Sequence, residues 1–169
     1  GAKLDLFQHF LGYAIPDQQT LSGLGGWDGR LVLEGTFAPG EGGIGAMTGT
    51  DLVLEGGSLM QFQLGANGMS DHLSLIALLE KGSEGTYLFD FEGGGEAGTT
   101  YNLVDFSFTT FLPGDFAYTD LAPGLTGTFA IGANTLQFVV IPEPSTLAVI
   151  LTGLGTMAIR RRRGSPLRN

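Results

Sequence analysis

A repeated five-residue motif constrains the fold of this chain more than any other feature of the sequence. Residues 31–35 read Leu-Val-Leu-Glu-Gly, residues 52–56 repeat this motif twenty-one positions later, and residues 73–75 keep its Leu-x-Leu alternation after the same interval. Short alternations of this kind, ended by glycine, are typical of β-strands followed by turns. A period of about twenty residues predicts a parallel β-helix, or β-solenoid, in which equivalent residues stack in successive rungs.

The period also predicts which leucines share the interior. One inward column is expected to contain Leu31, Leu52 and Leu73, and a second column beside it Leu33, Leu54 and Leu75. Residues 86–91, 100–106 and 135–141 are further predicted strands that do not keep the interval, and we expect them to form a β cap over the end of the solenoid. The alternative is a β-sandwich whose short strands happen to be evenly spaced.

Composition favours the same fold class. With 29 glycines, 15% charged residues and 43% apolar residues in 169 positions, the chain suits many short strands joined by tight turns. We therefore predict one all-β domain. There is no cysteine, which excludes disulfides, zinc–thiolate sites and thiol chemistry.

The charge of the chain is unevenly distributed. Up to residue 141 there are 16 acidic residues and only three basic ones, Lys3, Arg30 and Lys81, for a balance of −13. The remainder has Glu143 against five arginines. A body with so few basic residues cannot neutralise a run of phosphates. Its charge therefore excludes nucleic acid as a partner.

The C-terminal region has the pattern of a membrane segment. Residues 147–159 are thirteen uncharged, largely apolar residues, and Arg160, Arg161, Arg162 and Arg163 follow at once. A bilayer span needs roughly 20 apolar residues, so by length alone this segment could be a buried core element. Four consecutive arginines are costly to bury but can snorkel to the headgroups, which favours a short transmembrane helix with a cytoplasmic tail. Since no leader peptide follows Gly1, we expect any export signal to lie upstream of it.

A proline-bracketed motif, Pro142-Glu143-Pro144, lies between the last predicted strand and the apolar run, and Ser145 and Thr146 follow it. The prolines are expected to stop the strand and to leave this segment extended and accessible. The motif, the apolar run and the arginines, in this order over about the last 28 residues, resemble the PEP-CTERM sorting signal of bacterial exported proteins. The resemblance implies cleavage by an exosortase, a membrane-embedded cysteine protease or transpeptidase, and delivery to the cell surface or matrix. An ordinary permanent membrane anchor is the alternative.

Four short landmarks occur in order along the body. They are residues 19–23 (Gln-Thr-Leu-Ser-Gly), 35–40 (Gly-Thr-Phe-Ala-Pro-Gly), 52–64 and 70–73 (Ser-Asp-His-Leu). With them, roughly residues 3–140 resemble the autotransporter-associated β-strand repeat region of bacterial surface and secreted proteins. The resemblance implies β-helix rungs. The chain departs from that family at the long aromatic insertion of residues 7–17 and at Glu41-Gly42-Gly43, which replaces a more common Asn-Ser.

One group of residues has the side chains of a nucleophilic triad, namely Ser70, Asp71 and His72. Neighbours on a strand point to opposite faces, so Asp71 cannot orient His72 as a triad requires. The only other histidine is His9, sixty-three positions away. We expect His72 to be a polar residue at the start of a rung rather than a catalytic one.

Two further sites invite a binding or catalytic interpretation. One is an acidic group, Asp90, Glu92 and Glu96, which could act as paired carboxylates on a polysaccharide or as calcium ligands. Lys81 is the only cation near this group in the sequence, so an acidic polysaccharide would be repelled. A solvated acidic turn is the simpler interpretation. Trp27, in a glycine-rich loop, could stack on a sugar ring or cap the end of a small core.

The sequence thus predicts four segments. They are an extracytoplasmic β-solenoid end with its cap (1–141), a sorting motif (142–146), a transmembrane segment (147–159) and a basic cytoplasmic tail (160–169). We expect a non-enzymatic structural protein of the cell surface or extracellular matrix, without a cofactor or metal, whose partners are the exosortase and the membrane. The alternatives are a surface module that binds extracellular polysaccharide and the C-terminal part of an exported polysaccharide-degrading enzyme.

Overall fold

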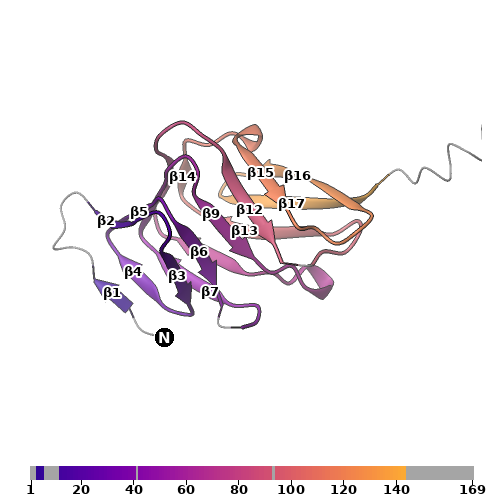
Figure 1. The fold of residues 1–169 in the computed structure, drawn as a ribbon, viewed down its shortest axis with the longest axis horizontal. Coiled ribbons are helices and arrows are strands. Elements are labelled where there is room, and N and C mark those ends of the chain that lie inside the picture. Colours follow the sequence, from indigo (N-terminus) through magenta and orange to yellow (C-terminus); the bar gives the residue numbers. More distant parts are fainter. Residues whose placement is uncertain (1–2, 6–11, 41, 93, 144–169) are drawn as a thin grey trace, which may run out of the picture.

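The computed structural model describes residues 3–5, 12–40, 42–92 and 94–143, and these ranges are mostly β-strand in parallel sheets (Figure 1). The predicted all-β class is therefore confirmed. The predicted transmembrane segment, residues 147–159, lies outside the described residues. Within the described ranges no helix has the length and apolar character needed to cross a membrane.

The strands form three sheets, named here A, B and C. Sheet A contains, in spatial order, β1 (Lys3–Asp5), β4 (Gly26–Asp28), β7 (Ala46–Gly49), β10 (His72–Leu75), β13 (Thr100–Asp105), β17 (Thr135–Pro142) and β16 (Leu125–Ile131). Sheet B contains β14 (Phe108–Thr109), β11 (Leu78–Lys81), β8 (Asp51–Leu54), β5 (Arg30–Leu33) and β2 (Tyr13–Ile15). Sheet C contains β15 (Phe116–Thr119), β12 (Tyr87–Phe91), β9 (Leu59–Phe62), β6 (Thr36–Pro39) and β3 (Thr20–Gly23). Two short 3₁₀ helices, η1 (Ala66–Gly68) and η2 (Pro113–Asp115), lie in the connections.

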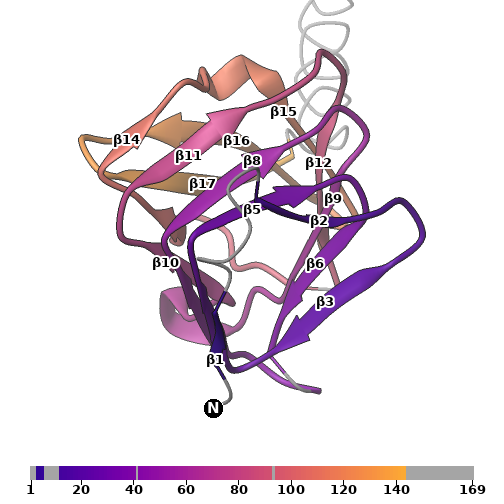
Figure 2. The same cartoon turned by 90° about the vertical axis from the view of Figure 1, so that its left-hand side faces the viewer.

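The chain visits the three sheets in turn, and one passage through A, B and C is called a circuit here. From β1 to β12, each strand pairs in parallel with the strand three places further along the chain. Figure 2 shows the three sheets around one common interior. Strands such as β5, β9 and β10 alternate between half-exposed and buried residues, because successive side chains of a strand point to opposite faces.

The predicted leucine columns are correct for their first two members and wrong for the third. Leu31 pairs with Leu52, and Leu33 pairs with Leu54 in the same two strands. The next residue beside Leu52 is Leu79, twenty-seven positions on, whereas Leu73 lies in sheet A beside Met47. The reason is that a circuit contains three strands and lengthens along the chain, so a fixed interval of twenty-one residues reaches a different sheet.

The cap is shorter than predicted. The strands expected at 86–91 and 100–106 are β12 and β13, which continue sheets C and A in parallel. The change of direction comes only with the hairpin of β16 and β17, where β17 pairs antiparallel with both β13 and β16. In Figure 1 this hairpin lies at the end of the molecule opposite β1. Two of its rings, Phe129 and Phe138, pack on Phe91 and close the interior at that end.

Aromatic rings extend through the whole interior. Trp27 contacts Phe37 at a centroid distance of 6.0 Å, and Phe37 contacts Phe62 at 6.4 Å. Phe62 contacts Phe89 at 5.4 Å, and Phe89 reaches Phe129 of the cap at 5.1 Å. Rings of this size bury a large apolar area, which a chain with so many glycines otherwise lacks. The phenylalanines of this interior therefore act in packing, as expected.

Candidate functional site

The predicted sorting motif begins inside the folded body. Pro142 is the last residue of β17 and pairs with Leu125, and the backbone N–H of Glu143 donates to the carbonyl of Gly124 at 2.9 Å. Pro142 and Glu143 are exposed, as predicted. Pro144 and the arginines Arg160, Arg161, Arg162 and Arg163 lie outside the described residues.

The strand ends at Pro142, where the prolines were expected to stop it, and the missing N–H of Pro142 is not needed there. Val140 donates its N–H to Thr99 on the β13 side of β17, at 2.9 Å. Pro142, two positions later, faces the same side, and the register of β13 with β17 ends at the pair Thr100 and Val139. A proline is tolerated in a strand where its nitrogen faces no partner.

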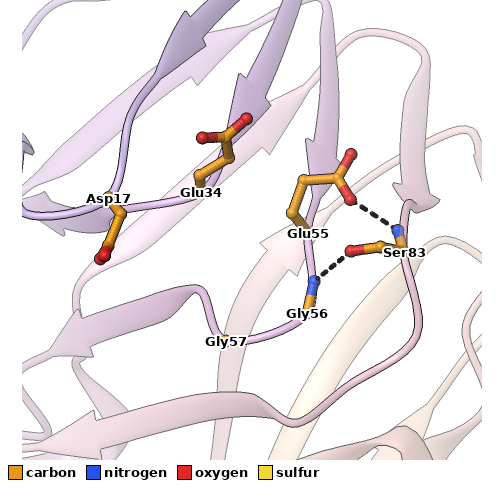
Figure 3. A pocket seen from close by; sticks show the side chains of 6 residues that line it. All are labelled: Asp17, Glu34, Glu55, Gly56, Gly57 and Ser83. Carbon is orange, nitrogen blue, oxygen red and sulfur yellow. Dashed lines mark hydrogen bonds between the residues drawn. The ribbon is translucent and has the colours of Figure 1, made fainter.

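A groove lined by acidic residues lies where the chain turns from sheet B to sheet C. Asp17, Glu34 and Glu55 occupy this corner in successive circuits, and Ser83 closes the groove on one side (Figure 3). The carboxylate of Glu55 accepts the backbone N–H of Ser83 at 2.6 Å, and the Ser83 hydroxyl accepts the N–H of Gly56 at 3.0 Å. The hydrogen bonds from Ser83 lower the pKa of Glu55. Sequence reasoning missed this groove, although the repeated Glu-Gly ending of the motif supplies two of its acidic residues.

Asp90, Glu92 and Glu96, which the sequence offered as possible paired carboxylates or calcium ligands, do not share one set of hydrogen-bond partners. Glu92 accepts a hydrogen bond from the Gln63 amide at 3.3 Å, and Glu96 accepts the backbone N–H of Asn67 at 2.8 Å. In the ranges that the structure describes, no group of three or more His, Cys, Asp or Glu residues is placed to hold a metal ion. The calcium hypothesis for Asp90 has no support from this geometry.

Asp90 has a different acidic neighbour, which the sequence did not indicate. Burial raises the pKa of Asp90 above its ordinary value, a hydrogen bond from Gln61 lowers it, and the nearby carboxylate of Asp120 raises it further. One of its oxygens, Oδ1, is buried without a hydrogen-bond partner. Asp120 has a positive φ of 53° and follows β15, thirty positions after Asp90. Only the pairing of β12 with β15 brings these two residues together.

Within the formal triad, Asp71 points away from His72, as strand alternation predicts. Ser70 and His72 lie on one side, where the Ser70 hydroxyl and His72 Nδ1 both contact the carbonyl of Asn102, at 3.1 and 3.2 Å. Asp71 is buried, and its two oxygens accept the backbone N–H groups of Gly45 at 2.7 Å and Gln63 at 2.8 Å. His72 instead has Nε2 at 3.0 Å from Oδ2 of Asp105. Asp71 thus joins the connection before β7, at Gly45, to the connection after β9, at Gln63. Because its carboxylate points away from His72, the two residues cannot act together in a triad.

The hypothesis that Trp27 stacks on a sugar is wrong, and its role in capping a small core is correct. The indole is only 2% exposed, and its Nε1 donates to the carbonyl of Asp51 at 3.1 Å. A side chain that is already packed and hydrogen-bonded presents no ring face to a ligand.

Comparisons of the chain with protein-family models, with curated proteins and with solved structures find no match.

Proposed function

We propose that this chain is an exported, non-enzymatic structural protein of the cell surface or extracellular matrix that carries a PEP-CTERM sorting signal. The observation that carries the proposal is the order of the C-terminal features. The Pro-Glu-Pro motif begins at the last residue of strand β17, and the apolar run and four arginines come after it in sequence. An exosortase would recognise Pro142, Glu143 and Pro144 and release the body from its membrane segment.

The body of this protein is, in this proposal, a parallel β-helix closed by a β cap. The cyclic order of the three sheets supports it, because each strand of the first four circuits pairs with the strand three places on. Stacked circuits bury one continuous interior and need a closing element at the end, since an open last circuit would leave strand edges unpaired. The β16–β17 hairpin supplies such an element on sheet A.

The polar side chains of the body support a structural role. Asp71 joins two connections, and Glu55 joins the corners of successive circuits through Ser83. The pKa of Asp115 is lowered by the backbone N–H of Leu112 and by Lys81, whose ammonium lies 2.8 Å from it. Charged groups used to hold neighbouring segments in place contribute to a stable scaffold, as a protein outside the cell requires.

A polysaccharide-binding module remains the second candidate, for one reason. A shallow groove on the outer face of sheet C is lined by Ser22, Gln61, Gln63 and Glu92, whose hydroxyl, amide and carboxylate groups could hydrogen-bond to sugars. A glycan array tests whether the body binds such sugars. Binding of the body to any extracellular polysaccharide, lost in Gln61→Ala, would favour this second candidate over a purely structural role.

The test of the first proposal is the mass of the processed protein. The chain, preceded by an export signal, is expressed in a host that contains an exosortase, beside a variant with Pro142, Glu143 and Pro144 all changed to alanine. We expect the wild type to lose Arg160–Arg163 and the variant to keep them. A matched control with Ser145→Ala and Thr146→Ala should be processed like the wild type. Retention of the arginines in the wild type would show a permanent anchor instead.

A further inference from the structure

We propose that the cap holds the chain as far as Glu143, so that a processing enzyme cannot reach the peptide bonds of β17 in the folded body and the mature body keeps all of β17. The identity of the enzyme rests on the proposed function above. The protection of these bonds rests on the described residues alone.

The hydrogen bonds of β17 continue to its last residues. On one side, Val140 donates to Thr99 at 2.9 Å and accepts from Gly98 at 2.8 Å. On the other side, the β16 pairing runs through Ile141 and Pro142, and Glu143 then donates to Gly124 at 2.9 Å. The backbone is thus held through the first two residues of the sorting motif.

The side chains of β17 hold it in the interior as well. Leu136, Phe138 and Val140 are fully buried, whereas Ile141 is 45% exposed. Phe138 packs on Phe91 at a centroid distance of 4.4 Å. A cut before Val140 would remove part of this packing from the body, so a protein processed there would lose the closing element of its core.

Proteases bind their substrates as extended segments and hydrogen-bond to the free backbone of the segment. A strand that is already paired offers that backbone only after local unfolding, which is least favourable in the packed core. β17 is paired on both sides up to Val140 and on one side up to Glu143. The peptide bonds of β17 up to Glu143 are therefore protected from cleavage while the body stays folded.

The processing reaction is the hydrolysis of a single peptide bond. One bond between a carbonyl carbon and an amide nitrogen breaks, water supplies a hydroxyl to the carbonyl and a proton to the nitrogen, and no oxidant or reductant is needed. The body leaves with a new carboxylate at its C-terminus. The apolar segment and its arginines leave with a new amino terminus.

The first experiment needs no sorting enzyme and therefore tests the inference separately from the proposed function. The full chain in detergent is treated briefly with a broad-specificity serine protease such as subtilisin, and the products are identified by intact mass. We expect the earliest cuts on this side of the body to fall after Glu143. An early cut between Phe138 and Glu143 in the folded protein would overturn the inference.

A pair of variants at one position shows whether strand pairing gives the protection. Thr126 pairs with Ile141, and its hydroxyl lies 2.8 Å from that of Tyr118. Thr126→Pro removes the backbone N–H, and we expect it to move the first cuts into residues 138–143. Thr126→Val loses only the hydroxyl and should leave the cuts after Glu143. Equal cutting patterns for Thr126→Pro and the wild type would overturn the inference.

Amide hydrogen exchange and the natural product complete the test. We expect the Glu143 amide to exchange at least about 100-fold more slowly than in an unfolded peptide. Exchange at Glu143 as fast as in an unfolded peptide would contradict the hydrogen bond from Glu143 to Gly124.

In the exosortase host, the mature mass should correspond to a chain that ends at Glu143 or later, and a product ending at Ile141 or earlier would overturn the inference. If the wild type and the triple-alanine variant both keep their arginines, the proposed function fails while the protease result still decides the inference.

Discussion

Arg30 and Glu80 form an ion pair that crosses over a strand lying between them. Nη1 of Arg30 on β5 is 2.8 Å from Oε2 of Glu80 on β11, and β8 runs between these two strands in sheet B. Val53 of β8 pairs with Glu80 in the sheet and belongs to the outward face, yet it is only 3% exposed. The ion pair thus joins the circuits of β5 and β11 across the outer surface of the circuit that lies between them.

We expect the contribution of this pair to stability to be small and to depend on salt. The two side chains are 42% and 34% exposed, so water and ions screen their attraction. Glu80→Gln should lower the free energy of unfolding by at most about 1 kcal/mol in low salt, and by less in high salt. Urea unfolding at two salt concentrations measures this, with Glu34→Gln on the same surface as the control. A loss of equal size at both salt concentrations would contradict an electrostatic origin.

The register of sheet B can be tested by a crosslink, because the chain has no cysteine of its own. Val53 pairs with Glu80 in neighbouring strands, so their Cα atoms should be about 5 Å apart, within disulfide range. Val53→Cys with Glu80→Cys should form a disulfide in air. Val53→Cys with Ser74→Cys, which follows the twenty-one-residue interval, should stay reduced. Thiol titration and non-reducing mass analysis distinguish the two, and the reverse outcome would refute the observed register.

Gly49 has no room for a side chain, because Trp27 packs on its Cα. A Cβ at this position would lie 2.3 Å from two carbons of the indole. Since Trp27 is buried and hydrogen-bonded, we expect Gly49→Ala to cost about 1–3 kcal/mol of folding free energy and to change the tryptophan fluorescence. Gly43→Ala is the control, because a Cβ there meets nothing within 4 Å. Equal stability of the two variants in urea unfolding would contradict the packing described.

Asp90 should make the protein less stable as pH rises. Its pKa in the folded state is raised above the ordinary value of 3.8, by burial first and then by the carboxylate of Asp120. From about pH 4 up to the raised pKa, the folded state keeps a proton that the unfolded state has lost, so the free energy of unfolding falls across this window. Asp90→Asn should reduce this fall, and the remainder comes from Asp71, whose pKa burial also raises. Urea unfolding from pH 3.5 to 7 compares the variant with the wild type. Glu92→Gln on the same face should keep most of the fall, because burial and Asp120 raise the pKa of Asp90 more than Glu92 does.

Local features of the chain were predictable from sequence because they depend on neighbouring residues. Alternating apolar residues indicated β5, β8 and β10, and the pairing of Leu31 with Leu52 followed from the repeat. The place of Leu73 was predicted wrongly, because nothing in the repeat reveals that three strands separate equivalent positions. The contact of Asp90 with Asp120 was not predictable either, since it depends on the pairing of β12 with β15.

The sequence by itself determined the strand content of this protein, the inward placement of the leucines in its repeat and the order of the features at its C-terminus. These follow from side-chain alternation, glycine turns and charge, which are local properties of the chain. Only the tertiary structure decided which circuit each strand joins and that the cap begins at β16. It also decided that Glu143 is still hydrogen-bonded to the body. Residues paired in parallel strands of this protein are 16 to 31 positions apart, as in Thr20 with Thr36 and Leu73 with Val104. The length of each connection decides which strand becomes the partner, and no local pattern encodes that length.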